Sequence, residues 1–478
     1  MARLVAAQCS FVFTCFLDKS ITSIGLHTVY TTASLRYPVS RVGISHRVSS
    51  YPLVVPCIFK FLLSTQHKRT GHLSAMTRYP GRSTGIGERP PLPNVLPVPA
   101  SLGTPITEPT AVALRQVVFG QCPSMIRSEF FSRGPGMVFR EAEQQLAYGL
   151  TFIGGDMIPM ARSVLMIVQA QILKTLLFET DPTRILKSRR NPLEPTMTIQ
   201  KEALVAAVAE ILWRAGSGQG ILCLPSKSIV HLPESPQFNH DGVTEKLQLV
   251  PFAKWDELVT VLRRYIYLFQ EEPGPAVLLL LYSAVLSRGL DRVNEDLMGR
   301  AANFSGLTHR SHLVNFKGSI SNSVLCLLMT GRASPFLHNG VQYRGDEDHA
   351  SIAETGLLIR SPLGLLLWMG NEEKTQATNL GSRLKTPIFP IWLVICCDQS
   401  GLLFCLDRAL MRDYRNEYNF QLHYYTSSHF QTGDTILNIC TRGFDETEPE
   451  IPLSTLDKII RTKWSGARVN WNGIVPYL

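Results

Sequence analysis

The chain has 478 residues, of which 45% are hydrophobic and 18% are charged, so it is long enough to bury one large core or two ordinary ones. A net charge of +9 would suit a nucleic-acid partner only if the folded part of the chain carried it. Residues 1–87 hold ten of the 47 Lys and Arg residues but one of the 38 Asp and Glu residues, so the remainder has no net charge and we expect no nucleic-acid partner.

The N-terminal residues 1–80 predict a basic leader without regular structure. Residues 4–16 are apolar enough to resemble a signal peptide, and the scattered Arg with few acids resembles a mitochondrial transit peptide. Polar residues dilute the apolar run and no small-residue cleavage site follows, so we interpret residues 1–80 as a disordered or wrongly assigned leader, with Met76 as an alternative start. Residues 81–109 are rich in proline and predict an extended linker, which places the folded domain at 110–478.

The ten cysteines include an adjacent pair, Cys396 and Cys397, but no CxxC spacing. Scattered cysteines in a chain of this size favour a reducing compartment, which predicts a cytoplasmic or nuclear location. The most apolar run, residues 276–286, is about half as long as the roughly 20 residues that a membrane span needs, so we expect a core helix there and no membrane.

Helical periodicity dominates the first part of the predicted domain. The longest predicted helix, Pro159–Glu179, is apolar around most of its circumference, which is typical of a buried helix. Pro159 suits a first helical turn and Pro182 stops the helix. A cysteine at its start would gain a lowered thiol pKa and backbone N–H groups for an oxyanion, yet this helix contains none. The other predicted helices cover residues 110–119, 141–150, 198–214 with Thr198 as the N-cap, 255–269, 276–286 and 321–331.

Strands dominate the last part of the chain. Residues 389–397 are mostly apolar, as in a strand that is buried on both faces, and a turn at 398–401 leads back into 402–406. Residues 420–425 and 435–440 continue the sheet. Helices early and strands late predict an α+β domain. The glycine-rich turn before a short strand at 221–224 lacks a following Gly-Lys-Ser/Thr, so we expect no nucleotide cofactor.

Six sequence blocks carry a resemblance to one known family, and they occur in the family's order. They are residues 114–120, 168–178, 283–288, 327–333, 384–394 with Trp392, and 460–478 with Trp464 and Trp471. These blocks resemble the MINDY family of deubiquitinases over about residues 105–478, most closely its third and fourth branches. The resemblance implies a papain-like cysteine-peptidase fold in which a helical half packs on an antiparallel sheet. It also implies lysine-48-linked ubiquitin chains as substrate.

The family's catalytic groups are a Cys at the start of the central helix, a Gln just before it and a His on the late sheet. Counting back from Val168, the cysteine position falls on Arg162, whereas counting from Gly154 and Gly155 places it near Met157 or Ile158. The glutamine position falls on Phe152 and the histidine position on Gln399.

The substituted residues cannot do the family's chemistry. An arginine guanidinium stays protonated and is no nucleophile, and a glutamine amide cannot take a proton from a thiol at neutral pH. The chain looks most like a B-type paralogue of the fourth branch that the resemblance implies to be inactive. We therefore expect a pseudo-deubiquitinase that binds ubiquitin or lysine-48-linked chains, or scaffolds a partner, without metal or cofactor. The alternative is an active thiol-dependent hydrolase that uses a relocated cysteine.

Four features could supply a replacement site. Ser428-His429-Phe430 copies the family's histidine motif, but it follows a block that the true histidine precedes, so we interpret His429 as a loop residue. Cys396, Cys397 and Cys122 could be relocated nucleophiles, although buried cysteines are commonly plain hydrophobic residues. The acidic run 346–349 is more typical of a solvated loop than of a metal site. Trp464 and Trp471 predict aromatic packing of the chain end on the sheet.

Overall fold

The computed structural model describes residues 97–99, 101–120, 122–131, 133–152, 157–179, 191–227, 229–298, 312–344, 352–442 and 453–477. The chain divides into two compact units, Met1–Arg89 and Pro90–Leu478, and every described residue belongs to the second. The predicted leader, the two glycines at 154 and 155 and the acidic run 346–349 lie outside the described residues.

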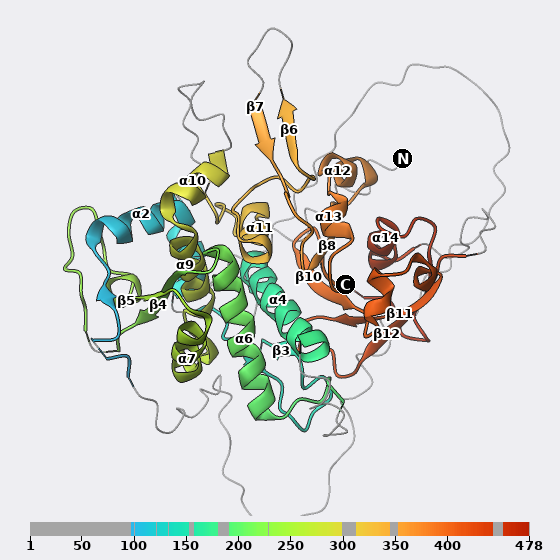
Figure 1. The fold of residues 1–478 in the computed structure, drawn as a ribbon, viewed down its shortest axis with the longest axis horizontal. Coiled ribbons are helices and arrows are strands. Elements are labelled where there is room, and N and C mark those ends of the chain that lie inside the picture. Colours follow the sequence, from blue (N-terminus) through green and yellow to red (C-terminus); the bar gives the residue numbers. More distant parts are fainter. Residues whose placement is uncertain are drawn as a thin grey trace, which may run out of the picture. The chain divides into compact units, whose positions relative to one another are not determined.

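The first half of the second unit is mainly helical, and its helix α4, Pro159–Lys174, lies where this half meets the late sheet (Figure 1). Its other helices are α2 (Glu108–Val118), α3 (Ser124–Phe131), α6 (Met197–Ala215), α7 (Trp255–Tyr265), α8 (Tyr267–Gln270), α9 (Ala276–Arg288), α10 (Leu290–Met298) and α11 (Asn322–Thr330). A three-stranded antiparallel sheet in the order β1-β5-β4 accompanies them, formed by β1 (Thr104–Pro105), β5 (Leu247–Phe252) and β4 (Gly220–Pro225).

The second half contains a six-stranded sheet in the order β13-β12-β11-β10-β9-β8 (Figure 1). Its strands are β8 (Gly364–Trp368), β9 (Ile391–Cys396), β10 (Gln399–Phe404), β11 (Asn419–Tyr425), β12 (Thr435–Cys440) and β13 (Arg468–Asn470). The α+β class is confirmed, but the sheet is not wholly antiparallel because β8 pairs with β9 in parallel. A parallel pair needs a long crossover, and α12 (Glu372–Ala377) and α13 (Ser382–Lys385) form part of it.

Alternate residues of β9 enter two different hydrophobic cores, as the prediction of a strand buried on both faces requires. Ile391, Leu393 and Ile395 pack in the core shared with the helical half, while Trp392 and Val394 pack in the core on the opposite face of the sheet. The second core is closed by α14 (Thr455–Arg461) and the C-terminal tail. Because alternate side chains of a strand point to opposite faces, β9 takes part in both cores.

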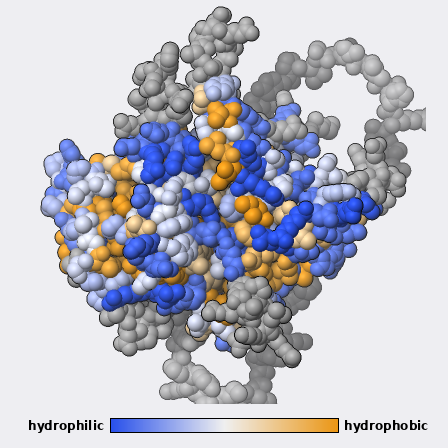
Figure 2. Space-filling view, viewed as in Figure 1, coloured by the Kyte–Doolittle hydropathy of each residue, from blue (hydrophilic) through white to orange (hydrophobic). Residues whose placement is uncertain are grey.

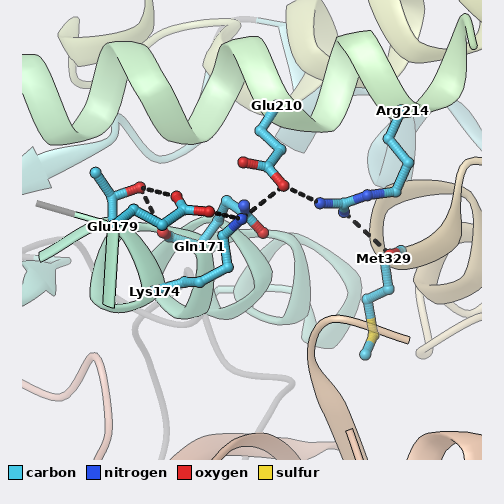
Figure 3. A network of polar contacts seen from close by, with 7 residues as sticks. Gln171, Lys174, Glu179, Glu210, Arg214 and Met329 are labelled. Atoms are coloured by element: carbon cyan, nitrogen blue, oxygen red, sulfur yellow. Dashed lines mark hydrogen bonds and ion pairs between the residues drawn. The ribbon is translucent and has the colours of Figure 1, made fainter. Parts of the chain in front are cut away.

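The predicted helix Pro159–Glu179 is confirmed: α4 continues into η1, a π-helical turn over Thr175–Glu179. It lies between α6 and strands β9 and β10, so nearly every side chain of α4 is buried. At its end, Lys174 is 2% exposed and its Nζ donates hydrogen bonds to Glu210 Oε1 at 2.6 Å and Glu179 Oε1 at 2.7 Å (Figure 3). The wider π-helical turn brings Glu179, five residues along, back to the lysine.

The central helix, rather than residues 276–286, is the described segment that could be mistaken for a membrane span. Pro159–Glu179 is long and apolar enough to cross a membrane by length and composition, unlike the shorter apolar run at 276–286. In the structure, 78% of the most apolar 18-residue stretch of this helix is buried inside the protein. It is therefore the core helix of this fold.

The predicted helix over 141–150 is wrong. Residues 141–149 form successive turns between the short strands β2 (Val138–Phe139) and β3 (Leu150–Thr151). Leu146 has a φ of 62°, which is incompatible with a right-handed helix. The buried amide of Gln169 replaces the helical hydrogen bonds, because it donates to Tyr148 O at 2.9 Å and accepts from Leu150 N at 2.6 Å.

Several predicted boundaries also shift. Regular structure begins at β1, inside the predicted linker 81–109, because its backbone pairs with β5. The N-cap of α6 is Thr196 and not Thr198, and the predicted helix 255–269 breaks at Ile266 into α7 and α8. The predicted turn at 398–401 lies two residues earlier, at 396–399, since Gln399 already pairs with Cys396 and Cys397 takes a left-handed φ of 53°.

The C-terminal tryptophans lock the chain end onto the sheet, as predicted. The Trp464 ring lies 5.4 Å from that of Trp392, and its Nε1 donates to Glu417 Oε2 at 3.0 Å. Trp471 Nε1 donates to Asp457 Oδ1 at 3.0 Å, and Asp457 also forms the capping box of α14 with Ser454. Each buried indole N–H therefore has a carboxylate partner.

Apolar side chains also reach the surface in places (Figure 2). The hairpin of β6 (Val341–Arg344) and β7 (Ile352–Thr355) is one such place, with Val341 44% and Tyr343 72% exposed. Single exposed apolar residues are normal on a protein of this size and do not by themselves mark a site.

Candidate functional site

The start of α4 and the start of β10 border a cavity of about 810 Å³. The three positions that sequence comparison assigned to the family's catalytic groups, Phe152, Arg162 and Gln399, all line it, and so does the alternative position Met157. The remaining lining residues are Ser400, the loop residues 426–435, Ile474 and Tyr477. Segments far apart in sequence therefore meet at the place where the family's chemistry was expected.

Arg162 and Gln399 touch each other directly. Arg162 lies in the first turn of α4, where its backbone N–H donates to Ile158 O at 3.2 Å, and its Nη1 donates a hydrogen bond to Gln399 Oε1. Gln399 is placed by the tight β9–β10 hairpin, in which it pairs with Cys396. The structure thus brings the two predicted positions together, while their equivalence to the family's Cys and His stays a prediction.

This arrangement offers hydrogen-bond donors but neither a nucleophile nor a base. Arg162 is a permanent cation, and the Gln399 amide does not titrate. Phe152 has no side-chain donor that could stabilise an oxyanion. At the helix start, Met160 N–H already donates to Gly318 O at 3.1 Å. Arg162, Gln399 and Phe152 therefore supply neither of the reacting side chains that acyl transfer needs.

The loop from Thr426 to Asp434 also lines the cavity and is held to the helical half of the domain. Arg140 Nη2 donates to Ser428 O at 2.7 Å, and Phe152 N donates to Ser427 O at 3.4 Å. Tyr148 OH donates to Asp434 Oδ1 at 3.3 Å. These bonds fix the loop backbone and leave the neighbouring side chain of Phe430 82% exposed at the cavity.

His429 is the lining residue whose position the sequence reasoning missed. It lies in a loop, as predicted, but that loop borders the same cavity as Arg162 and Gln399. Chain order argued against a catalytic histidine there and gave no information about its place in space. The signal that could have found it is the antiparallel order of β10, β11 and β12, which returns the β11–β12 loop to the start of β10.

Within the described part of the chain, no cysteine lines the cavity. Cys396 packs against the second hydrophobic core, on the face of the sheet away from the helical half. Burial and the neighbouring Cys397 raise the pKa of its thiol to about 11. Cys397 is exposed at the hairpin turn, and Cys122 is buried, with its Sγ donating to Asn315 O at 3.5 Å. Burial also raises the pKa of Cys122. A protonated thiol is a poor nucleophile, so Cys396 and Cys122 are unsuited to the relocated role.

His423 on β11 is the histidine that lies within the sheet, and it is also not a base for this cavity. Its side chain is 7% exposed and stacks on Phe404, with ring centroids 5.0 Å apart. Burial lowers its pKa below the ordinary 6.5, against the opposing effect of the Asp434 charge. The imidazole therefore remains neutral in the folded protein over a range in which the unfolded chain takes up a proton.

This burial predicts a pH dependence of stability. Below about pH 6.5 the unfolded state binds a proton that the folded state refuses, so the free energy of unfolding decreases as pH falls through that range. In His423→Phe, which keeps an aromatic ring on Phe404, we expect that part of the slope to disappear. Chemical denaturation of both proteins from pH 7 to pH 5 measures it. Equal slopes would show that His423 does not contribute.

Comparison with known proteins identifies the family to which the domain around this cavity belongs. Residues 115–473 match the family model described as "Deubiquitinating enzyme MINDY-3/4, conserved domain". The chain is 34% identical over 319 residues to the mouse "Probable ubiquitin carboxyl-terminal hydrolase MINDY-4", covering 66% of this chain and 40% of that protein. It is 34% identical to the human protein of the same name over 317 residues, with the same coverage.

A more distant relative is the mouse "Ubiquitin carboxyl-terminal hydrolase MINDY-3", with 27% identity over 323 residues, 62% of this chain and 66% of that protein. No solved structure matches. The chain spans about 40% of the length of the MINDY-4 relatives. The family model covers most of the chain and nearly all of its folded domain, and the chain therefore belongs to the MINDY-3/4 family of deubiquitinating enzymes.

Proposed function

We propose that this chain is a pseudo-deubiquitinase, which binds ubiquitin or lysine-48-linked ubiquitin chains at the described cavity without hydrolysing them. The observation that carries the proposal is the direct hydrogen bond between Arg162 and Gln399. These residues occupy the positions that the resemblance assigns to the nucleophile and the base. Their contact across 237 residues of sequence supports that assignment.

The cavity retains features of a peptide-binding site. Its volume of about 810 Å³ is in the range of ordinary ligand pockets. Exposed Phe430 and Ile474 offer apolar contacts. The serines and threonines of the loop 426–434 offer hydrogen bonds. Large aromatic residues at such rims commonly carry much of the binding energy.

The alternative is a working hydrolase with a relocated thiol. His429 favours it to the extent that a histidine does line the cavity. However, the described cysteines lie elsewhere, and a nucleophile must be within hydrogen-bond reach of its base. The geometry supports the binding protein better.

Binding to lysine-48-linked tetra-ubiquitin tests the proposal. We expect the chain to bind, and Phe430→Ala to weaken binding by about tenfold, because truncation removes the exposed aromatic contact at the cavity. Tyr414→Ala is the matched control, since Tyr414 is 68% exposed and does not line the cavity. Titration by biolayer interferometry or calorimetry measures the three affinities. No binding by the folded wild-type chain, or equal losses in both variants, would contradict the proposal.

A further inference from the structure

The side-chain charge in the first turn of α4 is positive, whereas the N-terminus of a helix favours negative side chains. The N-terminus of a helix carries a partial positive charge, which acidic residues in the first turn normally compensate. The first turn of α4 contains no acidic residue, and Arg162 adds a full positive charge there. Among the described residues, no carboxylate lies within the 4.0 Å that would define an ion pair with Arg162. A bound anion would relieve this concentration of positive charge.

The hydrogen bond to Gln399 orients the guanidinium without neutralising it. One N–H of Arg162 is engaged by the Gln399 amide oxygen, and a guanidinium has five N–H donors. Within the described part of the chain the other guanidinium N–H groups have no hydrogen-bond partner. A planar guanidinium held in this way suits the two oxygens of a carboxylate.

A second, independent group points to a polar ligand. Ser400, next to Gln399, is 5% exposed and lines the cavity. Its Oγ has no hydrogen-bond partner within the described residues. A buried hydroxyl without a partner costs free energy, which a ligand oxygen would recover if the cavity wall opened toward this solvent-shielded Oγ.

The other titratable residues on the cavity wall restrict where an anion can sit. These are His429 and Asp434, both on the loop 426–434, and Tyr477 near the C-terminus, a phenol whose pKa burial raises. Asp434 already accepts a hydrogen bond from Tyr148, and its negative charge disfavours an anion at the loop side. The preferred position for an anion is therefore at Arg162, which lines the cavity.

We infer that this position binds the free C-terminal carboxylate of ubiquitin, with Arg162 as the residue that recognises it. The inference rests on the proposed function and adds a specificity to it. A ubiquitin C-terminus in an isopeptide bond has an amide in place of the second carboxylate oxygen and carries no charge. The site therefore selects ubiquitin, or the end of an unanchored chain, whose last residue is not conjugated.

Two forms of ubiquitin that differ in one group test this specificity. The probes are ubiquitin with its native C-terminal acid and the same protein with a C-terminal carboxamide. We expect the full chain to bind the acid at least about tenfold more tightly, as the loss of a charge-assisted hydrogen bond implies. Arg162→Gln should abolish the difference and Arg162→Lys should retain part of it. Arg412→Gln, an exposed arginine outside the cavity, should leave it unchanged.

The outcomes separate the two proposals. Binding of acid and carboxamide with equal affinity would overturn the carboxylate specificity and leave the ubiquitin-binding function standing. Failure of the folded wild-type chain to bind either form would overturn both. A preference for the acid that persists in Arg162→Gln would overturn the role of Arg162.

Discussion

Replacing Lys174 with methionine is expected to lower the free energy of unfolding by about 3 kcal/mol. Lys174 is 2% exposed and its ammonium group joins Glu179 and Glu210, while Arg214 Nη2 donates to the same Glu210 oxygen at 2.7 Å (Figure 3). Removing the lysine leaves two carboxylates without their common partner. Both are partly exposed, so the expected loss lies at the lower end of the range for a broken buried pair.

The carboxylate side of this network gives the prediction its controls. Burial raises the pKa of Glu210, but the hydrogen bonds and charges of Lys174 and Arg214 outweigh it and hold the pKa below 4.5. The stabilisation is therefore complete above the unfolded pKa and decreases as pH falls through the folded one. Adding Glu210→Gln to Lys174→Met should restore part of the stability, and Lys201→Met, an exposed lysine on α6, should change it by less than about 0.5 kcal/mol. Denaturant unfolding measures all four proteins, and equal effects of the two single lysine variants would contradict the account.

The sequence predicted the elements whose burial is simple and failed where tertiary contacts override local pattern. The helix Pro159–Glu179 and the strand β9 are long apolar runs, and their burial on all sides follows directly from composition. Residues 141–150 have enough apolar residues for a helix, yet they form turns because the side chain of Gln169, 21 residues beyond Tyr148, satisfies their backbone. The parallel pairing of β8 also depends on a crossover that no local pattern reveals.

The sequence proposed the residues of the candidate site but could not give their geometry, and their equivalence to the family's catalytic groups stays a prediction. The family resemblance pointed to Phe152, Arg162 and Gln399, and physical chemistry then excluded a nucleophile and a base among them. Their convergence depends on contacts between residues more than 200 positions apart, such as Arg140 with Ser428 and Arg162 with Gln399. For the same reason the places of His429 and Ser400 at the cavity emerge from the folded chain alone.

Hydrolysis of lysine-48-linked ubiquitin chains is expected to be absent. Acyl transfer by a papain-like site needs a thiolate next to a base, and the loss of the nucleophile or the base from such a unit costs about a million-fold in kcat. In this chain the assigned positions hold a guanidinium and an amide that bond to each other. No described cysteine lines the cavity to replace the missing thiol.

The most direct test is to incubate the purified, folded chain with lysine-48-linked tetra-ubiquitin for several hours, with and without prior treatment by iodoacetamide. The account predicts intact tetra-ubiquitin in both samples, although the untreated protein still binds the chains. Cleavage that alkylation abolishes would establish a relocated cysteine and contradict the pseudo-deubiquitinase proposal. Cleavage that survives both alkylation and repurification would contradict it as well, because the protein would then hydrolyse the isopeptide bond without a thiol.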